Sequence, residues 1–235
     1  MPNYIKNRLV ILGTNQQIEE VFEKYNTHFS AKLATSYDGD IICRNSSKEE
    51  FTVGWFNPYT TKFKTREDNT ERVGLPEKWE MEVKPAIDVF PDFKKIISPP
   101  NDDAYKDIPS QEIARNSPNW WYTWNINNWG TKWNISECER EKFGCYTFIT
   151  AWSGVPELMR VLSEQNPAVE FYYEYADEDT GSNCASYKFK KGEIITSFEP
   201  KSQSKEAYDL SFKLRPHYKD DYVLIDGKYE YKEDD

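Results

Sequence analysis

The chain has 235 residues, of which 38% are apolar and 16% aromatic, and its formal net charge is −10. A chain of this length can bury a core without disulfides or metals, and its large rings compensate for the low aliphatic content. Thirty basic residues against forty acidic ones, with no basic run, argue against general binding to nucleic acid or to an anionic membrane.

The beginning of the chain carries no apolar leader, and no apolar run approaches the roughly 20 residues of a membrane-spanning helix. We therefore expect a cytoplasmic protein without a membrane partner. In that compartment cysteines stay reduced, so four free thiols are expected, at Cys43, Cys138, Cys145 and Cys184.

The first predicted elements are a strand over 4–12, ending at Gly13, and a helix capped by Thr14 or Asn15. The helix is indicated by apolar residues at spacing i, i+3, i+4 and i+7, which are Ile18, Val21, Phe22 and Tyr25.

Residues 30–85 have a different pattern, with short alternating runs between turn signals. Asp38-Gly39 predicts a hairpin between 31–37 and 40–43. A second turn at 57–60 predicts a hairpin between 51–56 and 61–65. We expect a small β-meander here, followed by a polar loop over 66–74.

The stretch 88–97 is expected to form a second core strand, which ends before Pro99-Pro100. Ser117-Pro118 is typical of a helix start, with proline in the first position. This short helix should end near Trp129, before Gly130.

The second half of the chain predicts a strand over 146–152, a helix from Pro156 and a strand over 168–176. The helix should turn Val155, Leu158, Met159 and Leu162 toward the core. The remaining elements are a hairpin over 185–198 that turns at Lys191-Gly192, the stretch 205–214, which fits helix or strand with helix favoured, and a hairpin of 222–225 with 228–231.

Without the insert, the predicted order is β-α-β followed by β-α-β, which is the ferredoxin-like split βαβ sandwich of the α+β class. The predicted domains are a ferredoxin-like domain over 1–29 and 86–200, a β-meander insert over 30–85 and a C-terminal extension over 201–235. The name describes topology and implies no iron–sulfur cluster.

Several short motifs resemble the YubB-like family. The strongest are Trp121-Tyr122-Thr123-Trp124 and the run from Asn128 to Trp133, and the weaker ones are Met1-Pro2-Asn3 with Asn7-Arg8-Leu9, the run 93–97 with Pro99-Pro100, and the run 150–153 with Pro156. The resemblance covers 1–29 and 86–180. It implies a ferredoxin-like fold and genes of bacteria, phages and plasmids, and it implies no agreed activity. Tyr4 in place of the usual tryptophan, Ser98 within the Pro-containing stretch, and the long insert depart from the family pattern.

Motifs for catalysis or cofactor binding are missing from the sequence. There is no glycine-rich phosphate loop and no metalloprotease or deaminase motif. His28 and His217 are the only histidines, and Cys138 and Cys145 lack the CxxC spacing of metal sites. The acidic run 177–183 departs from the calcium-loop pattern and fits a solvated turn better. We expect no metal and no cofactor.

The segment 120–133 contains five of the eight tryptophans. These rings can pack a helix onto the sheet, which we favour, or they can form the floor of a ligand pocket. If the chain after Gly130 is extended, Thr131 and Trp133 face the core and Lys132 faces water. The candidate ligand-binding residues of the second interpretation are Trp124, Asn128, Trp129, Thr131, Lys132, Trp133 and Trp152.

The functional hypothesis from sequence is an accessory protein that is not an enzyme and binds another protein. The alternative is an enzyme or a small-ligand-binding protein that uses the segment 120–133.

Overall fold

The computed structural model describes residues 3–29, 87–101, 105 and 117–232, together with short strand segments between residues 32 and 84. The chain divides into two compact units. The larger unit comprises Met1–Thr27 and Val89–Asp235, and the smaller one comprises His28–Asp88.

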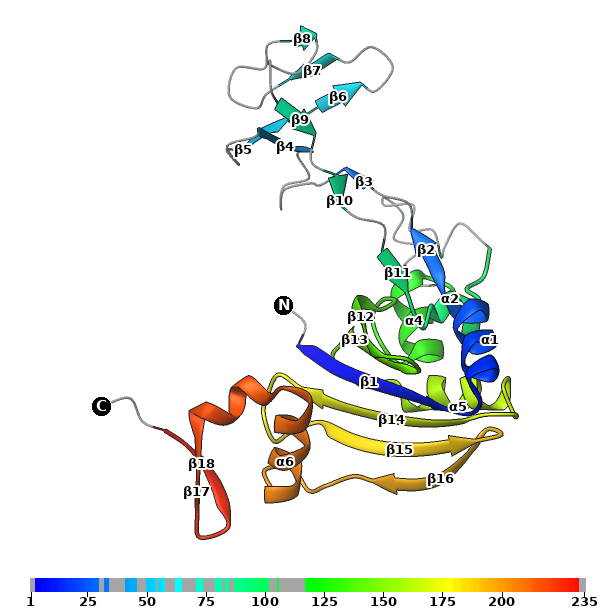
Figure 1. Cartoon of the computed structure of the whole chain (residues 1–235), viewed down its shortest axis with the longest axis vertical. Coiled ribbons are helices and arrows are strands. Elements are labelled where there is room, and N and C mark those ends of the chain that lie inside the picture. The colour runs from blue at the N-terminus through cyan, green and yellow to red at the C-terminus, as the bar shows by residue number, and fades with distance from the viewer. Residues whose placement is uncertain are drawn as a thin grey trace. The chain divides into compact units, whose positions relative to one another are not determined.

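The larger unit is built on a six-stranded sheet in the order β12-β13-β1-β14-β15-β16 (Figure 1), and every neighbouring pair is antiparallel. The strands are β1 (Tyr4–Leu12), β12 (Ser136–Lys142), β13 (Cys145–Ala151), β14 (Glu170–Asp177), β15 (Cys184–Lys190) and β16 (Glu193–Phe198). The helices are α1 (Asn15–Tyr25), α2 (Phe93–Ile96), α4 (Trp121–Trp129), α5 (Pro156–Glu164), α6 (Lys205–Leu214) and the 3₁₀ helix η1 (Pro216–Asp221).

Four of these strands and two helices form the split βαβ. In chain order they are β1, α1, β12, β13, α5 and β14. In the sheet the four strands lie in the order β14-β1-β13-β12. This arrangement is the ferredoxin-like topology, so the predicted α+β class is confirmed. The second strand of the motif is β12, for which the sequence analysis had no element.

The stretch 88–97 is not the second core strand, and this prediction was wrong. β11 (Ile87–Val89) includes only the first two residues of this stretch, and α2 begins at Phe93, capped by the side chain of Asp92, which accepts a hydrogen bond from the backbone N–H of Lys94 at 3.0 Å. Phe90, Phe93 and Ile96 are all buried. Their spacing of three residues fits one face of a helical turn rather than alternate positions of a strand.

Other local predictions are confirmed. Thr14 caps α1 through a capping box with Gln17. Gly130 ends α4 with a φ of 75°, which a glycine adopts without strain. The helix starts at Trp121, later than the predicted Ser117, because residues 117–120 form turns.

The hydrophobic core lies between the sheet and the helices α1, α2, α4 and α5. Alternate residues of β1 face this core, and Ile5, Asn7, Leu9 and Ile11 are buried. The opposite face of the sheet is covered at one end by α6, whose Leu210 and Leu214 pack with other buried residues, Ala176, Cys184 and Ala207.

The predicted C-terminal hairpin is confirmed as β17 (Tyr222–Ile225) and β18 (Lys228–Tyr231). It packs on α6 through aromatic contacts. The ring of Tyr229 lies 5.0 Å from Phe212 and 5.4 Å from Tyr208, measured between ring centroids.

A buried amide joins three strands and the start of a helix. Asn7 donates through Nδ2 to the carbonyl of Ile5 at 2.9 Å and to Oγ1 of Thr150 at 2.9 Å. Its Oδ1 accepts a hydrogen bond from the hydroxyl of Tyr173 at 2.5 Å, and that hydroxyl accepts one from the backbone N–H of Val155 at 2.8 Å. Asn7 and Tyr173 are both fully buried, so the amide and the hydroxyl satisfy each other inside the core.

The smaller unit contains short strands. Among those described, β4 (Ile41–Asn45) pairs with β5 (Glu50–Val53) and β9 (Trp79–Met81), and β7 (Lys62–Lys64) pairs with β6 (Trp55–Asn57) and β8 (Glu71–Val73). The pairing of β6 with β7 agrees with the hairpin predicted between 51–56 and 61–65, whereas β8 lies in the stretch predicted as a loop. β3 (Lys32–Leu33) pairs with β10 (Val83–Lys84), and β2 (Thr27–Phe29) pairs with β11.

The hairpin predicted around Asp38-Gly39 was wrong as far as the described strands show, because β3 and β4 pair with other strands. The turn itself lies outside the described residues, as does most of the predicted loop 66–74, of which 71–73 are strand β8.

The substitution Asn7→Ala should lower the free energy of unfolding by about 3 kcal/mol, because it takes away the acceptor of the buried Tyr173 hydroxyl and the amide that donates to the buried Thr150 hydroxyl. Asn128→Ala is the matched control, because Asn128 is exposed, and it should change stability by less than about 0.5 kcal/mol. Urea melts of both variants measure the difference. Equal melts would show that the buried amide contributes little.

Candidate functional site

Two of the candidate tryptophans belong to the core or pack directly on it. Trp129 is 2% exposed, and its Nε1 donates to the carbonyl of Ile97 at 2.9 Å. Its ring meets Phe93 at 6.0 Å and Trp124 at 5.3 Å between centroids, both edge to face. For Trp124 and Trp129, core packing is the interpretation that these contacts favour.

The segment after Gly130 is bent rather than extended. Thr131 is 1% exposed, and its hydroxyl both donates to the carbonyl of Ala151 at 2.9 Å and accepts from the Ala151 N–H at 3.1 Å. Asn125 donates through Nδ2 to the carbonyl of Lys132 at 2.9 Å. These side-chain hydrogen bonds hold the bends, so the expected alternation fails and Trp133 is half-buried instead of facing the core.

Lys132 lies against two indole rings. Its Nζ is 4.7 Å from the ring centroid of Trp133 and 5.2 Å from that of Trp152, within the range of cation–π attraction. The ring of Tyr122 meets Trp152 edge to face at 6.0 Å. We call Tyr122, Lys132, Trp133 and Trp152 the aromatic–lysine site.

The ammonium of Lys132 has ring contacts but no ion pair and no hydrogen bond with any residue that the structure describes. It therefore keeps three N–H donors for water or for a ligand. Asn128, also a candidate, is exposed and donates to the carbonyl of Trp124 at 2.8 Å. The structure thus brings Lys132, Trp133 and Trp152 together, and it uses Thr131 and Asn128 for backbone hydrogen bonds.

Trp152 has a backbone conformation that is unusual for a residue other than glycine, and its side chain is partly exposed. Its φ is 70°, and 39% of the residue is exposed. A bulky residue at positive φ is strained and persists only where neighbouring contacts hold it. Here the N–H of Trp152 donates to the carbonyl of Asn3 at 2.9 Å, and its carbonyl accepts from Nδ2 of Asn183 at 3.0 Å.

A buried carboxylate holds both of these partners. Asp177, 4% exposed, accepts hydrogen bonds from Asn3 Nδ2 at 3.2 Å, from Asn183 Nδ2 at 2.7 Å and from the N–H of Asp179 at 3.1 Å. The solvated turn predicted after β14 is therefore only partly correct, because Glu178 and Asp179 are exposed while Asp177 is buried. This supporting shell was missed by sequence reasoning, since nothing local connects Asn3 with Asp177.

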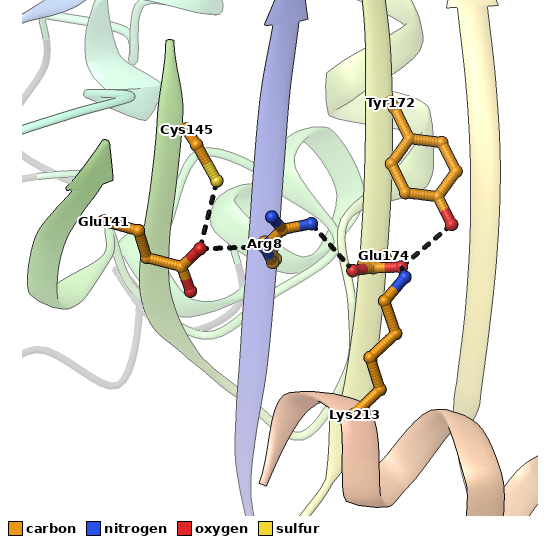
Figure 2. Close-up of polar contacts among 6 residues, drawn as sticks. All are labelled: Arg8, Glu141, Cys145, Tyr172, Glu174 and Lys213. Atoms are coloured by element: carbon orange, nitrogen blue, oxygen red, sulfur yellow. Dashed lines mark hydrogen bonds and ion pairs between the residues drawn. The ribbon is translucent and has the colours of Figure 1, made fainter. Parts of the chain in front are cut away.

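A second cluster lies on the opposite face of the sheet (Figure 2). Glu174 is fully buried and accepts from Arg8 at 3.1 Å, from the Tyr172 hydroxyl at 2.9 Å and from Lys213 at 2.5 Å. Arg8 also pairs with Glu141 at 2.9 Å. Sequence analysis did not find this cluster, because it depends on the register that sets Arg8 opposite Glu174.

The thiol of Cys145 belongs to this cluster and is not activated. Its Sγ donates to Glu141 at 3.1 Å, and burial, with the carboxylate beside it, raises the pKa of the thiol to about 11. Burial alone would raise the pKa of Glu141, but hydrogen bonds from Arg8 and Cys145 lower it below the ordinary value. A nucleophile needs the thiolate and a base needs an unpaired carboxylate, so the cluster fits a structural role.

Within the described ranges, no group of three or more histidine, cysteine, aspartate and glutamate side chains could hold a metal ion. In the same part of the chain, no helix is long and apolar enough to cross a membrane.

The two tryptophans that flank the bend should differ in stability. Trp129→Ala should lower the free energy of unfolding by about 3–5 kcal/mol, as for other buried large-to-small changes. Trp133→Ala should cost about 1–2 kcal/mol, because the ring is half-buried. Thermal or urea melts measure both. A larger loss for Trp133 than for Trp129 would contradict the packing described above.

Cys145 should react slowly with iodoacetamide at pH 8 in the native protein. Its raised pKa and full burial leave little accessible thiolate, so the rate should be at least about a hundredfold below that in urea. Mass spectrometry of the peptide that contains Cys145 gives the rate. Equal rates in the native and unfolded protein would mean that the thiol is open to solvent.

No curated protein and no solved structure matches the chain. Residues 132–221 match the family described as "Ferredoxin-like domain in Api92-like protein". The match runs from just before β12 to the end of η1, which is less than half of the chain, and it leaves out β1 and α1. It does not carry the YubB-like name, which stays a prediction. The second half of the chain therefore contains a ferredoxin-like domain of the kind described for Api92-like proteins.

Proposed function

We propose that the protein is a binding module without catalytic activity, and that the aromatic–lysine site binds a proline-containing, extended segment of another protein. The observation that carries the proposal is Trp152, an exposed ring on a backbone with a φ of 70°.

The cost of this conformation supports a role in binding. A non-glycine residue at positive φ costs on the order of 1–3 kcal/mol, and the 39% of Trp152 that is exposed gains nothing from burial. Asn3, Asp177 and Asn183 nevertheless hold the backbone of Trp152 in place through four hydrogen bonds, two to Trp152 and two to the carboxylate of Asp177. Such a supporting shell is what a preorganised binding residue needs.

The chemistry of the site supports an extended proline-containing ligand. Polyproline segments have no internal hydrogen bonds, so their carbonyls are free to accept, and they dock on aromatic-lined surfaces. The rings of Tyr122, Trp133 and Trp152 supply that surface, and the three N–H donors of Lys132, which no described residue accepts, can meet the carbonyls. The net charge of −10 argues against an acidic ligand.

The pairing of the other polar groups supports a function other than catalysis. Glu174 and Asp177 are buried and bound by several donors, and the pKa of Cys145 is raised rather than lowered. An enzyme site would need a nucleophile or an acid–base pair with a shifted pKa in a cleft.

The variant Trp152→Gly separates binding from folding. Glycine adopts a φ of 70° without strain, and this gain offsets part of the packing that is lost with the partly covered ring, so the variant should lose no more than about 1–2 kcal/mol of stability. Decaproline titrated into ¹⁵N-labelled parent protein should shift the indole N–H signals of Trp152 and Trp133. Trp152→Gly should weaken this binding by at least about tenfold, because tryptophan commonly dominates such contacts.

Tyr231→Ala is the control, because it removes a ring that is 63% exposed on the C-terminal hairpin, and it should leave peptide binding unchanged. The proposal fails if decaproline does not bind, or if Trp152→Gly is strongly destabilised, which would make the ring structural. Binding of a small aromatic acid such as indole-3-acetate without peptide binding would favour a small-ligand site at the same residues.

A further inference from the structure

The strand β16 is a free edge of the large sheet and carries little protection against pairing with another strand. It is the last strand in the sheet order (Figure 1), and all six of its residues are exposed. Ile194 is 52% exposed, Ile195 50% and Phe198 46%. An edge strand offers a row of unpaired N–H and C=O groups, and apolar side chains beside them favour pairing with another strand.

The strand at the opposite edge of the sheet, β12, is protected against pairing with another strand. β12 has the sequence Ser-Glu-Cys-Glu-Arg-Glu-Lys, and its pairing with β13 is interrupted by two register shifts. Charged residues and bulges are the usual means by which proteins block edge pairing. β16 carries less of this protection: between residues 193 and 198 it has one charged residue, Glu193, and one bulge, at Ile195, which has no partner on β15.

We infer that β16 pairs antiparallel with β16 of a second copy of this chain, which joins two six-stranded sheets across a twofold axis. This surface is separate from the aromatic–lysine site and does not depend on the function proposed for it.

The pleat of the sheet selects a register for this pairing. Through their partners on β15, Ile194 and Ser197 lie on the core side, opposite Phe189 and Tyr187, whereas Glu193 and Phe198 lie on the other side. Strands that pair must place opposed residues on the same face. A twofold axis between Ile195 and Thr196 does so, because the bulge at Ile195 shifts the alternation of β16, and the axis then sets Ile194 against Ser197 and Glu193 against Phe198. A shift by one residue opposes side chains from different faces.

In this register, a positive charge at one end of β16 lies near a negative charge at the other end of β16 in the second copy. The same register sets Gly192 opposite Glu199, so the Lys191 turn of one copy lies beside Glu199 of the other, and the contact occurs twice. Lys191 makes no ion pair with any described residue. The neighbouring Lys190 is already paired with Glu170 at 2.8 Å, which reduces its repulsion toward Lys201 of the second copy.

Pairing through β16 closes at two copies. The same strand is used by both partners, and the other edge of each sheet is β12, which is protected. Such an isologous contact gives a dimer rather than a filament. A contact through six residues is smaller than the roughly 1,600 Å² of a standard interface, so the dimer should be weak and in exchange with monomer. The charge of −10 on each chain opposes association, so added salt should strengthen it.

Sedimentation equilibrium of the full chain, from about 5 to about 500 µM, tests the inference. The parent should pass from monomer to dimer within this range, at lower concentration in 0.5 M than in 0.05 M salt. Ile195→Lys places a charge on the edge and should raise the dissociation constant by more than about tenfold. Ile225→Lys is the matched control, since Ile225 is 46% exposed on the C-terminal hairpin, and it should dimerise like the parent.

Hydrogen exchange on the parent protein gives a second readout that needs no variant. Amides of residues 193–198 should become more protected as the protein concentration rises, and those of 222–231 should not. The inference is overturned if the parent stays monomeric, if Ile195→Lys dimerises like the parent, or if Ile225→Lys disrupts the dimer equally. Exchange in 193–198 that does not depend on concentration would also overturn it.

Discussion

The buried amide of Asn7 is the interaction on which the rest of the larger unit depends. It lies on β1, the strand at the centre of the ferredoxin-like motif, and it bonds to β13 through Thr150 and to β14 through Tyr173. The Tyr173 hydroxyl then accepts from Val155 at the start of α5. Because each buried group finds a partner, the network favours one register and one helix position at little cost. The Thr150 hydroxyl donates to the carbonyl of Ser153, which ties the turn that carries Trp152 to the same network.

The two faces of the sheet use their polar groups in different ways. On the core face, the neutral amide and hydroxyl groups around Asn7 satisfy one another. On the other face, the buried carboxylate of Glu174 requires cations, and it receives one from β1 and one from α6. An unpaired buried carboxylate would be costly, so Lys213 both neutralises Glu174 and fixes α6 over the sheet. Charged residues in this chain can therefore mark structure rather than chemistry, and the exposed aromatic residues are the better guide to function.

Sequence patterns predicted the elements whose signals are local. The stripe of α1, the cap at Thr14, the alternation of β14 and the hairpin turn at Asp226-Gly227 are each contained within a dozen residues. The failures have physical causes as well. β12 is a charged edge strand without apolar alternation, and Phe90, Phe93 and Ile96 looked like a strand because all are apolar. For the site, the tryptophan-rich segment 120–133 pointed to Lys132 and Trp133, and the candidate set included Trp152. The shell around Trp152 joins residues up to 174 positions apart, which only the fold can reveal.

Trp152 of the aromatic–lysine site and the edge strand β16 are both exposed, and they offer different groups to a partner. Trp152 is held outward by a rigid shell at the end of β13, whereas β16 offers backbone groups along the side of the sheet. A partner of one therefore does not use the groups of the other. A dimer formed through β16 would carry two aromatic–lysine sites at a fixed separation, and an extended ligand with repeated proline motifs could occupy both. Once such a ligand is bound at one site, its binding at the second site is intramolecular. The high effective concentration at the second site then raises the overall affinity above that of a single site. Weak self-association and weak peptide binding would then reinforce each other, since a bivalent ligand stabilises the dimer by the same factor by which the dimer improves its binding.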